Sequence, residues 1–254
     1  MKVRNKLIAT LLAVTVVNVA LAADKKKDAP SPWKGSKVSL GDITTTTGKK
    51  SSTNITFNSI LNYNLKRWTE TGQASFQYGK NDGVLNKKQY SVQNQLQYSF
   101  NDNAKIDNYG YVKGSYQHDD FAAYQSQIVA MAGYGRDWIK NKTFQVTTQI
   151  APGIRQLKEQ SPSNKVSNNA ALQLSLLTTW QLTKYFSASE SADYTIGHPA
   201  NYLKSTTSLV SALTGSLALS VDFEFDYWSS PPKSGSQVTT STSTSVSLVY
   251  SFSS

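Results

Sequence analysis

Apolar and polar side chains alternate with a period of two along most of the chain. The clearest case is residues 217–227, where apolar residues hold every odd position and polar or acidic residues hold most even positions. Residues 88–100, 144–155, 171–182 and 246–252 repeat the pattern. Such alternation predicts β-strands with one apolar and one polar face.

Turn-forming residues divide the chain after residue 33 into segments of this kind. Most segments have ten or more residues, which exceeds the ~5–6 of a globular strand and suits a tilted membrane strand of ~9–11. Their even number, twelve, is typical of bacterial outer-membrane barrels. The expected strands are 33–44, 53–65, 67–78, 88–100, 106–117, 124–138, 143–155, 168–182, 185–197, 203–213, 216–228 and 238–252.

The connections between these segments alternate in length. Those after even-numbered strands are tight, as at Lys66 and Thr214-Gly215, whereas most after odd-numbered strands are longer, as at 79–87, 156–167 and 229–237. Short turns at one end and long loops at the other are typical of outer-membrane barrels. A sheet in lipid must also close, because an open edge leaves backbone groups unpaired. The expected fold is therefore all-β, a closed antiparallel transmembrane β-barrel of about 12 strands with both termini in the periplasm.

All five tryptophans fall at ends of the expected strands, which predicts aromatic girdles at the two membrane interfaces. The alternative is that they are core residues of a soluble β-sandwich. The expected girdle consists of Trp33, Trp68, Trp138 and Trp180 at the periplasmic end and Trp228 at the outer end.

The N-terminus resembles a secretory signal peptide. Lys2, Arg4 and Lys6 precede an apolar run at 7–21, and Ala20 and Ala22 give the small-x-small pattern of a cleavage site. An anchor helix is the alternative, although the run is short of the ~20 residues that span a membrane. We expect a signal peptide at 1–22, a short periplasmic lead-in at 23–32 and the barrel at 33–254.

Composition narrows the chemistry further. The chain has 254 residues, no cysteine, two histidines and a net charge of +10, so thiol nucleophiles, disulfides and cysteine-ligated zinc are excluded. The lysines are scattered through loops, which suits a rim facing lipopolysaccharide better than a nucleic-acid surface. We expect outer-membrane lipid, lipopolysaccharide and the barrel-assembly machinery as partners, no nucleic acid, and no cofactor.

Several short motifs support a family resemblance. They are Trp33 and Gly35, Gly41 before a run ending Thr47-Gly48, the central Gly133-Tyr134-Gly135, and the close Tyr250-Ser251-Phe252. On these residues, 33–252 resembles the salt-induced outer-membrane protein family. The chain departs from it at Lys49-Lys50, where the family has Asn and a small residue. The resemblance implies an outer-membrane barrel and supplies no reaction.

Outer-membrane hydrolases provide templates for a catalytic site. His118 lies near the expected outer rim with Ser115 three residues before it, but they form no His-x-Ser pair on one strand face. His118-Asp119-Asp120 has the wrong order for a protease couple, and His198 lies in a loop. Calcium at Asp119 and Asp120 needs more oxygen ligands than one loop provides. We expect no catalytic residues and no metal site.

Charged residues on the polar faces predict a lumenal charge constellation. Its expected members are Asp222, Glu224 and Asp226 on one strand, Lys204 opposite Asp226, Arg155, and less surely Asp193. These residues either brace the lumen as ion pairs or set a field that selects solutes in a narrow channel.

Three polar residues fall on faces expected to meet lipid: Glu70, Asn94 and Glu190. Strands 1, 5 and 6 alternate weakly, so their registers stay open. Three functions are compatible with the sequence: a non-enzymatic barrel that is a narrow channel or an envelope protein of salt or osmotic stress, a barrel hydrolase at the outer rim, and a surface-binding β module without a pore.

Overall fold

The computed structural model describes residues 32–47, 50–101, 107–232 and 239–252. The expected signal peptide at 1–22 and most of the lead-in lie outside these residues. No helix among the described residues is long and apolar enough to cross a membrane.

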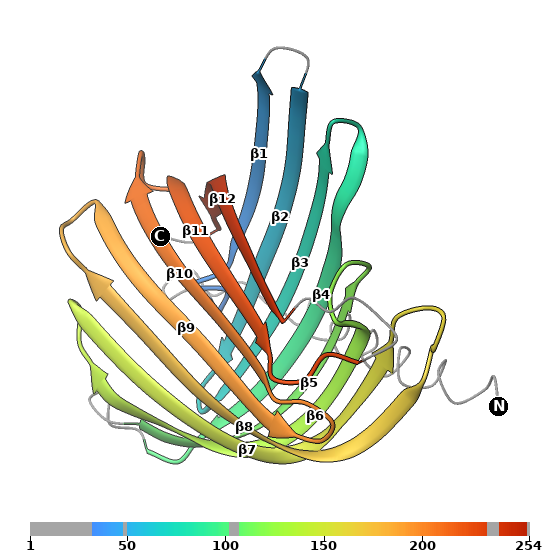
Figure 1. Cartoon of the computed structure of the whole chain (residues 1–254). Helices are drawn as coiled ribbons and strands as arrows, with labels where there is room; N and C mark the ends of the chain where they lie inside the picture. Colours follow the sequence, from blue (N-terminus) through green and yellow to red (C-terminus); the bar gives the residue numbers. More distant parts are fainter. Residues whose placement is uncertain (1–31, 48–49, 102–106, 233–238, 253–254) are drawn as a thin grey trace.

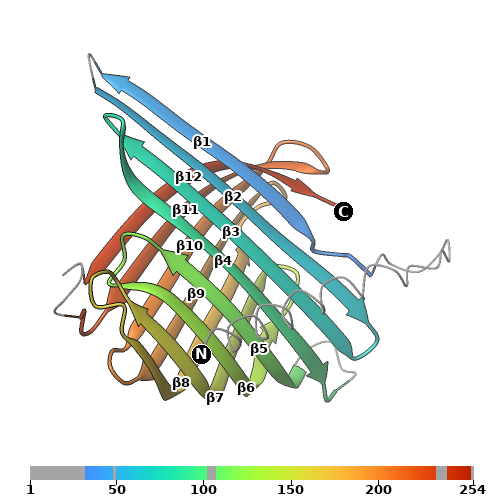
Figure 2. The same cartoon turned by 90° about the vertical axis from the view of Figure 1, so that its right-hand side faces the viewer.

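Twelve antiparallel strands form one closed barrel in which each strand pairs with its neighbours in the sequence. Figures 1 and 2 show the tilted strands following one another round the wall. The all-β closed barrel predicted from alternation is confirmed. The strands are β1 (Lys37–Thr47), β2 (Lys50–Leu65), β3 (Trp68–Asn81), β4 (Val84–Ser99), β5 (Asp107–Asp119), β6 (Tyr124–Lys140), β7 (Phe144–Glu159), β8 (Val166–Gln181), β9 (Phe186–Gly197), β10 (Tyr202–Ala212), β11 (Leu217–Trp228) and β12 (Thr240–Ser251).

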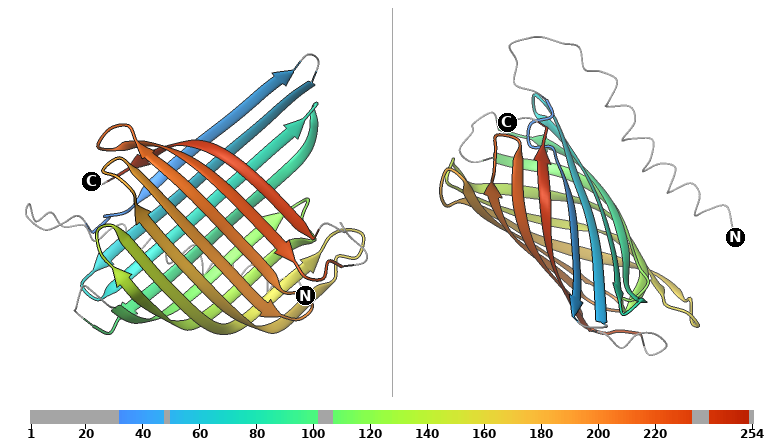
Figure 3. Two further views of the ribbon diagram at one scale, coloured as in Figure 1. Left: turned by 60° about the vertical axis from the view of Figure 1, so that its left-hand side comes forward. Right: turned by 90° about the horizontal axis from the view of Figure 1, so that it is seen from above.

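The barrel closes through a short seam. β1 pairs with β12 from Lys37 opposite Ser251 to Leu40 opposite Leu248, and the Phe252 amide donates to the Ser36 carbonyl at 3.1 Å. The β1–β2 ladder, by contrast, runs the full length of β1. Figure 3 shows the β1–β2 hairpin projecting at one end of the wall.

The connections at the two ends of the barrel differ less in length than the sequence suggests. Residues 79–87, expected as a loop, continue β3 and β4 to a tight Asp82-Gly83 turn in which both residues have positive φ. An Asp-Gly pair with this geometry is a strong hairpin former. The long β11–β12 connection remains at that end. Because short turns of outer-membrane barrels face the periplasm, we assign the end with Lys37, Ser251 and the β2–β3 turn as periplasmic.

The outer face of the wall is apolar. On β11, Leu219, Val221 and Phe223 are exposed, whereas Ser220 and Asp226 are buried on the lumenal side. The facing predicted for this strand is therefore confirmed. Exposed aromatic rings gather at the periplasmic end, among them Trp68, Trp138 and Trp180. A belt of exposed apolar side chains bounded by aromatic rings is the surface that lipid requires.

One of the expected girdle tryptophans, Trp228, lies elsewhere, and Trp33 lies at the periplasmic end but outside the strand that was expected to contain it. Trp228 is 6% exposed and points inward, so it is not part of a lipid-facing girdle. Trp33 precedes β1 in a turn, where its ring packs against the edge of Tyr63 with centroids 5.2 Å apart. The first strand thus begins at Lys37, later than expected, because the Ser36 amide bonds to the Trp33 carbonyl instead of to a neighbouring strand.

Each of the three polar exceptions on the lipid face has a hydrogen-bond partner on that face. The Asn94 side chain donates to Glu70 at 2.9 Å. The hydroxyls of Ser205 and Thr207 both donate to Glu190. Each carboxylate therefore has hydrogen-bond partners outside the lumen, which lowers the cost of placing it on this face.

Candidate functional site in the lumen

The acidic residues of β11 form a row along the lumen. The tight turn after β10 sets their register, since the amides of Ser216 and Leu217 donate to the Thr214 hydroxyl. This turn places Lys204 opposite Asp226, as the sequence predicted.

Hydrogen bonds distribute the charge of this row unevenly. Lys204 Nζ lies 2.7 Å from Glu224 Oε2 and forms an ion pair with it. Asp226 accepts a hydrogen bond from the Tyr202 hydroxyl, and Asp222 accepts one from Ser220 at 2.9 Å. Among the described side chains, neither Asp222 nor Asp226 has a cation within 4.0 Å, so Glu224 is the one member of the row that forms an ion pair.

A second ion pair crosses the lumen. Lys113 Nζ on β5 lies 3.7 Å from Asp193 Oδ2 on β9, although three strands separate these two in the wall. The Ser175 hydroxyl also donates to Asp193. Lys113 was missed in the sequence because the weak alternation of its strand left its facing open. The bridge narrows the lumen across β5–β9.

Arg155 faces inward but does not join the acidic row. Its side chain is 1% exposed, and its guanidinium donates to the carbonyls of Gly197 and Ala200 in the β9–β10 connection. Its Nε and Nη1 atoms have no hydrogen-bond partner among the described residues. Arg155 therefore lies on the lumenal side, as the sequence predicted, but its hydrogen bonds go to backbone carbonyls at the end of β9 and in the β9–β10 connection instead of to the acidic row.

Packed side chains narrow the outer end of the lumen. Trp228 lies between Tyr124 and Tyr202, with ring centroids 4.8 Å and 4.3 Å away. Leu157 and Ala200 belong to the same buried cluster. A cavity of about 210 Å³ lies beside it and is lined in part by Tyr202, Asp226 and Lys87.

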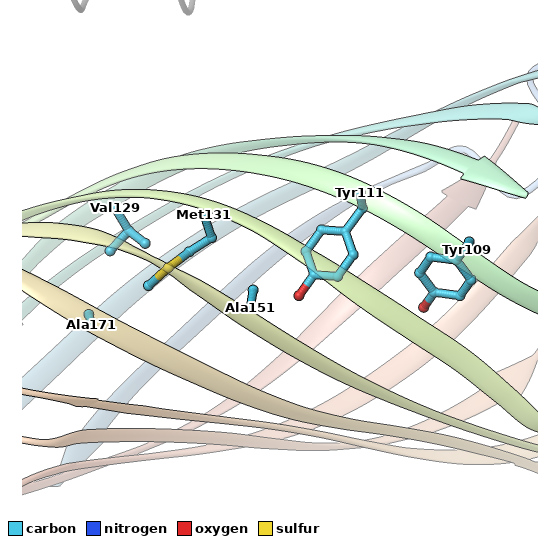
Figure 4. Close-up of a cluster of buried hydrophobic side chains, with 6 residues drawn as sticks. All are labelled: Tyr109, Tyr111, Val129, Met131, Ala151 and Ala171. Carbon is cyan, nitrogen blue, oxygen red and sulfur yellow. The ribbon is translucent and has the colours of Figure 1, made fainter.

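A second buried cluster covers the lumenal side of β5–β8. Figure 4 shows Tyr109 and Tyr111 projecting to the same side of the sheet as Val129 and Met131. A Cβ on Gly135 would lie 2.2 Å from the Tyr109 ring, so this glycine of the Gly133-Tyr134-Gly135 motif makes room for the ring. Inward aromatic residues also explain why the alternation of β5 and β6 is weak.

His118 and Ser115, the two residues compared above with hydrolase templates, lie on different faces of the wall. His118 pairs with Ser126 in register and stacks on Tyr90 outside the barrel, whereas Ser115 shares the lumenal face with Lys113. Among described residues, no hydrogen bond joins Ser126 to His118. His118 Nε2 instead lies 2.7 Å from Asp120 Oδ1.

Asp120 lies in the β5–β6 connection with Lys88 at 3.1 Å. Desolvation raises the pKa of Asp120, but the hydrogen bonds from His118 and Lys88 outweigh this effect and lower it. Asp119 pairs with Lys87 at 3.7 Å instead. Within the described ranges, no cluster of three His, Cys, Asp or Glu residues forms a metal site.

The comparison with family models decides the classification. A model described as "Protein of unknown function, DUF481" matches residues 38–252. The chain belongs to the DUF481 family. No curated protein matches this chain.

Solved structures share the DUF481 chain's fold. An outer membrane channel from Pseudomonas putida F1 is 11% identical with a TM-score of 0.51, covering 91% of this chain and 100% of its own. The NanC porin is 10% identical with a TM-score of 0.49, covering 85% and 99%. Outer membrane phospholipase A from Escherichia coli is 11% identical with a TM-score of 0.47, covering 91% and 95%. The closed barrel and its exposed apolar belt place the DUF481 chain in the outer membrane.

Proposed function

We propose that this outer-membrane barrel is a narrow, non-enzymatic channel for small solutes with a mild preference for cations. The observation that carries the proposal is the excess of carboxylates in the acidic row: Lys204 forms an ion pair with Glu224, while Asp222 and Asp226 have no cation within 4.0 Å among the described side chains. Carboxylates that line a constriction are a common basis of cation selectivity.

The size of the barrel supports a narrow passage. Eight strands leave an interior filled by side chains, and 16–18 leave an open channel, so twelve strands lie between these cases. The Lys113–Asp193 bridge and the Trp228 cluster reduce the width further. Any solute that passes is small.

Reversal potential across a salt gradient in a planar bilayer tests the proposal. The row spans ~14 Å because alternate residues lie ~7 Å apart, which is comparable with the ~8 Å Debye length at physiological salt. The three potentials therefore overlap, and Asp222→Asn, Glu224→Gln and Asp226→Asn together should lower the cation preference.

A matched control removes the same charge elsewhere. Glu70→Gln, Asp120→Asn and Glu190→Gln change three carboxylates that face away from the lumen, and this variant should keep the wild-type reversal potential. Absence of conductance in the wild-type protein would refute the channel. An unchanged reversal potential in the variant that lacks all three carboxylates of the acidic row would show that the row only braces the barrel.

The role in salt or osmotic stress is proposed on the family resemblance alone. A strain lacking the protein should grow more slowly than its parent at high salt and equally well at low salt. Restoring the wild-type gene should restore growth, whereas equal growth of the two strains in both media would refute this role.

A further inference from the structure

A groove of about 620 Å³ runs across the outside of the barrel, on the face that meets lipid. It crosses β6 to β10, and its wall includes Tyr134, Ile150, Leu174, Tyr194 and Leu203. These five side chains follow one another in register from strand to strand. They therefore form one continuous apolar ridge.

The row of residues beside this ridge contains two small side chains, Thr148 and Ala192. The adjacent row pairs Arg136 with Thr148, Thr148 with Leu176, and Leu176 with Ala192. Thr148 and Ala192 leave space that the large ridge residues do not fill.

The groove has a polar end near the periplasmic interface. Arg136 lies four residues before the end of β6, and its guanidinium stacks 4.3 Å from the centroid of Trp138. The Trp138 indole donates to Thr148 at 2.8 Å, which fixes the ring. The buried Arg136 Nε has no hydrogen-bond partner, and no carboxylate within the described part of the chain pairs with Arg136.

The apolar end lies deeper in the membrane. Leu203, at the far end of the groove, is nine residues from the periplasmic end of β10. The groove thus climbs from the interface at Trp138 through the membrane toward the outer end of β10, where Leu203 is the second residue. A charged end at the interface and an apolar end in the hydrocarbon match the two parts of a phospholipid.

We propose that this groove binds one glycerophospholipid of the periplasmic leaflet, with its phosphate on Arg136 and an acyl chain along the Tyr134–Leu203 ridge. Arginine presents a planar set of donors that matches phosphate oxygens. Near the interface of a barrel a lipid-facing arginine is tolerated, and a lipid phosphate there supplies the counter-charge that no carboxylate of the described residues provides. The site is independent of conduction through the lumen.

Native mass spectrometry of the full mature barrel in an uncharged detergent tests the site, with phosphatidylglycerol as the probe. The wild-type barrel should keep one lipid after the detergent is removed. Arg136→Gln should raise Kd about tenfold, as expected for the loss of a charge-assisted hydrogen bond. Leu174→Trp, which fills the groove, should weaken binding independently of the charge.

Lys184→Gln is the matched control. Lys184 is also a cation near an aromatic ring at the periplasmic end, 5.4 Å from the Tyr185 centroid, but it lies outside the groove. Binding by this variant should equal that of the wild-type protein. Only barrels that assemble, as judged by heat-modifiable migration, are compared, and Leu174→Trp decides the outcome if Arg136→Gln does not assemble.

Two further ligands separate the contribution of the phosphate headgroup from that of the acyl chains. Glycerol 3-phosphate and diacylglycerol should each bind more weakly than phosphatidylglycerol, because each lacks one half of the ligand. Equal binding of either would overturn the proposal, as would unchanged lipid retention in both groove variants. A protein dimer lost in Leu174→Trp, with lipid retention unaffected, would show that a second copy occupies the groove.

Discussion

The lumenal faces of β5–β8 and of β10–β12 have the same strand geometry but different side chains. Tyr109, Tyr111 and Met131 fill the inward positions of the first region and are buried against one another. Serine, threonine and the acidic row occupy most inward positions of the second, with Tyr202, Lys204 and Trp228 among the others. Inward facing alone therefore does not define a channel lining. The bulky region packs tightly and braces the barrel, whereas the polar region lines the conducting path that we propose.

The largest effect should come from placing an arginine on the lipid-facing side of β11 instead of on its lumenal side. Phe223→Arg places a charge on the lipid face, where arginine near mid-membrane costs about 2–4 kcal/mol. Asp222→Arg changes the neighbouring residue, which faces the lumen. The yield of heat-modifiable barrel should fall far more for Phe223→Arg, and equal losses would refute the facing of this strand.

A tightly packed glycine tests the bracing region. Gly135→Ala forces the buried Tyr109 ring to move, because the new Cβ would lie 2.2 Å from it. Overpacking of this kind costs about 1–3 kcal/mol. Gly72→Ala on β3 is the control, since its nearest atoms would lie 4.0 Å away. Only Gly135→Ala should unfold at clearly lower denaturant concentration, and equal midpoints would contradict the packing.

The Lys113–Asp193 bridge, which joins the bulky region to β9, should affect conduction more than stability. Lys113→Ser releases Asp193 from its partner at 3.7 Å and removes a long side chain from the lumen. One carboxylate in water attracts a cation 4 Å away by about 1 kcal/mol, roughly a fivefold change in local concentration. Single-channel conductance and cation preference should both rise. A fall in either would show that the bridge holds the passage open.

The smallest effect should be at the outer rim. The pKa of Asp120 is lowered in the folded protein by its bonds with His118 and Lys88. Its stabilisation is therefore present above the unfolded pKa of about 3.9 and is lost as pH falls through the lower folded value. At pH 6 the Tm of Asp120→Asn should lie slightly below that of the wild-type protein. The difference is small because solvent screens the exposed pairs that Asp120 forms with His118 and Lys88. At pH 2 the difference should vanish, and a difference that grows on acidification would contradict the lowered pKa.

Local patterns predicted the barrel well, because lipid and the pleat impose a strict alternation. The Thr214-Gly215 turn was enough to place Lys204 opposite Asp226. The Asp82-Gly83 pair is itself a hairpin signal, so the residues at 79–87 continue β3 and β4 to this turn, where the spacing of the segments predicted a loop.

Contacts across the lumen were beyond sequence reasoning. Lys113 and Asp193 lie on strands that are not neighbours, so no register rule joins them. The Arg155 guanidinium binds loop carbonyls, and the inward position of Trp228 depends on partners from β6 and β10. A strand-end tryptophan can point either way, and only tertiary packing decides which.

Thiol modification during conductance measurement tests the central claim most directly, because the chain contains no cysteine. A positively charged, water-soluble thiol reagent should reduce the single-channel current of Asp222→Cys in discrete steps. Phe223→Cys, one residue away on the lipid face, should be unaffected. An unchanged current in Asp222→Cys after confirmed labelling, or equal block in both variants, would contradict a conducting path along the acidic row.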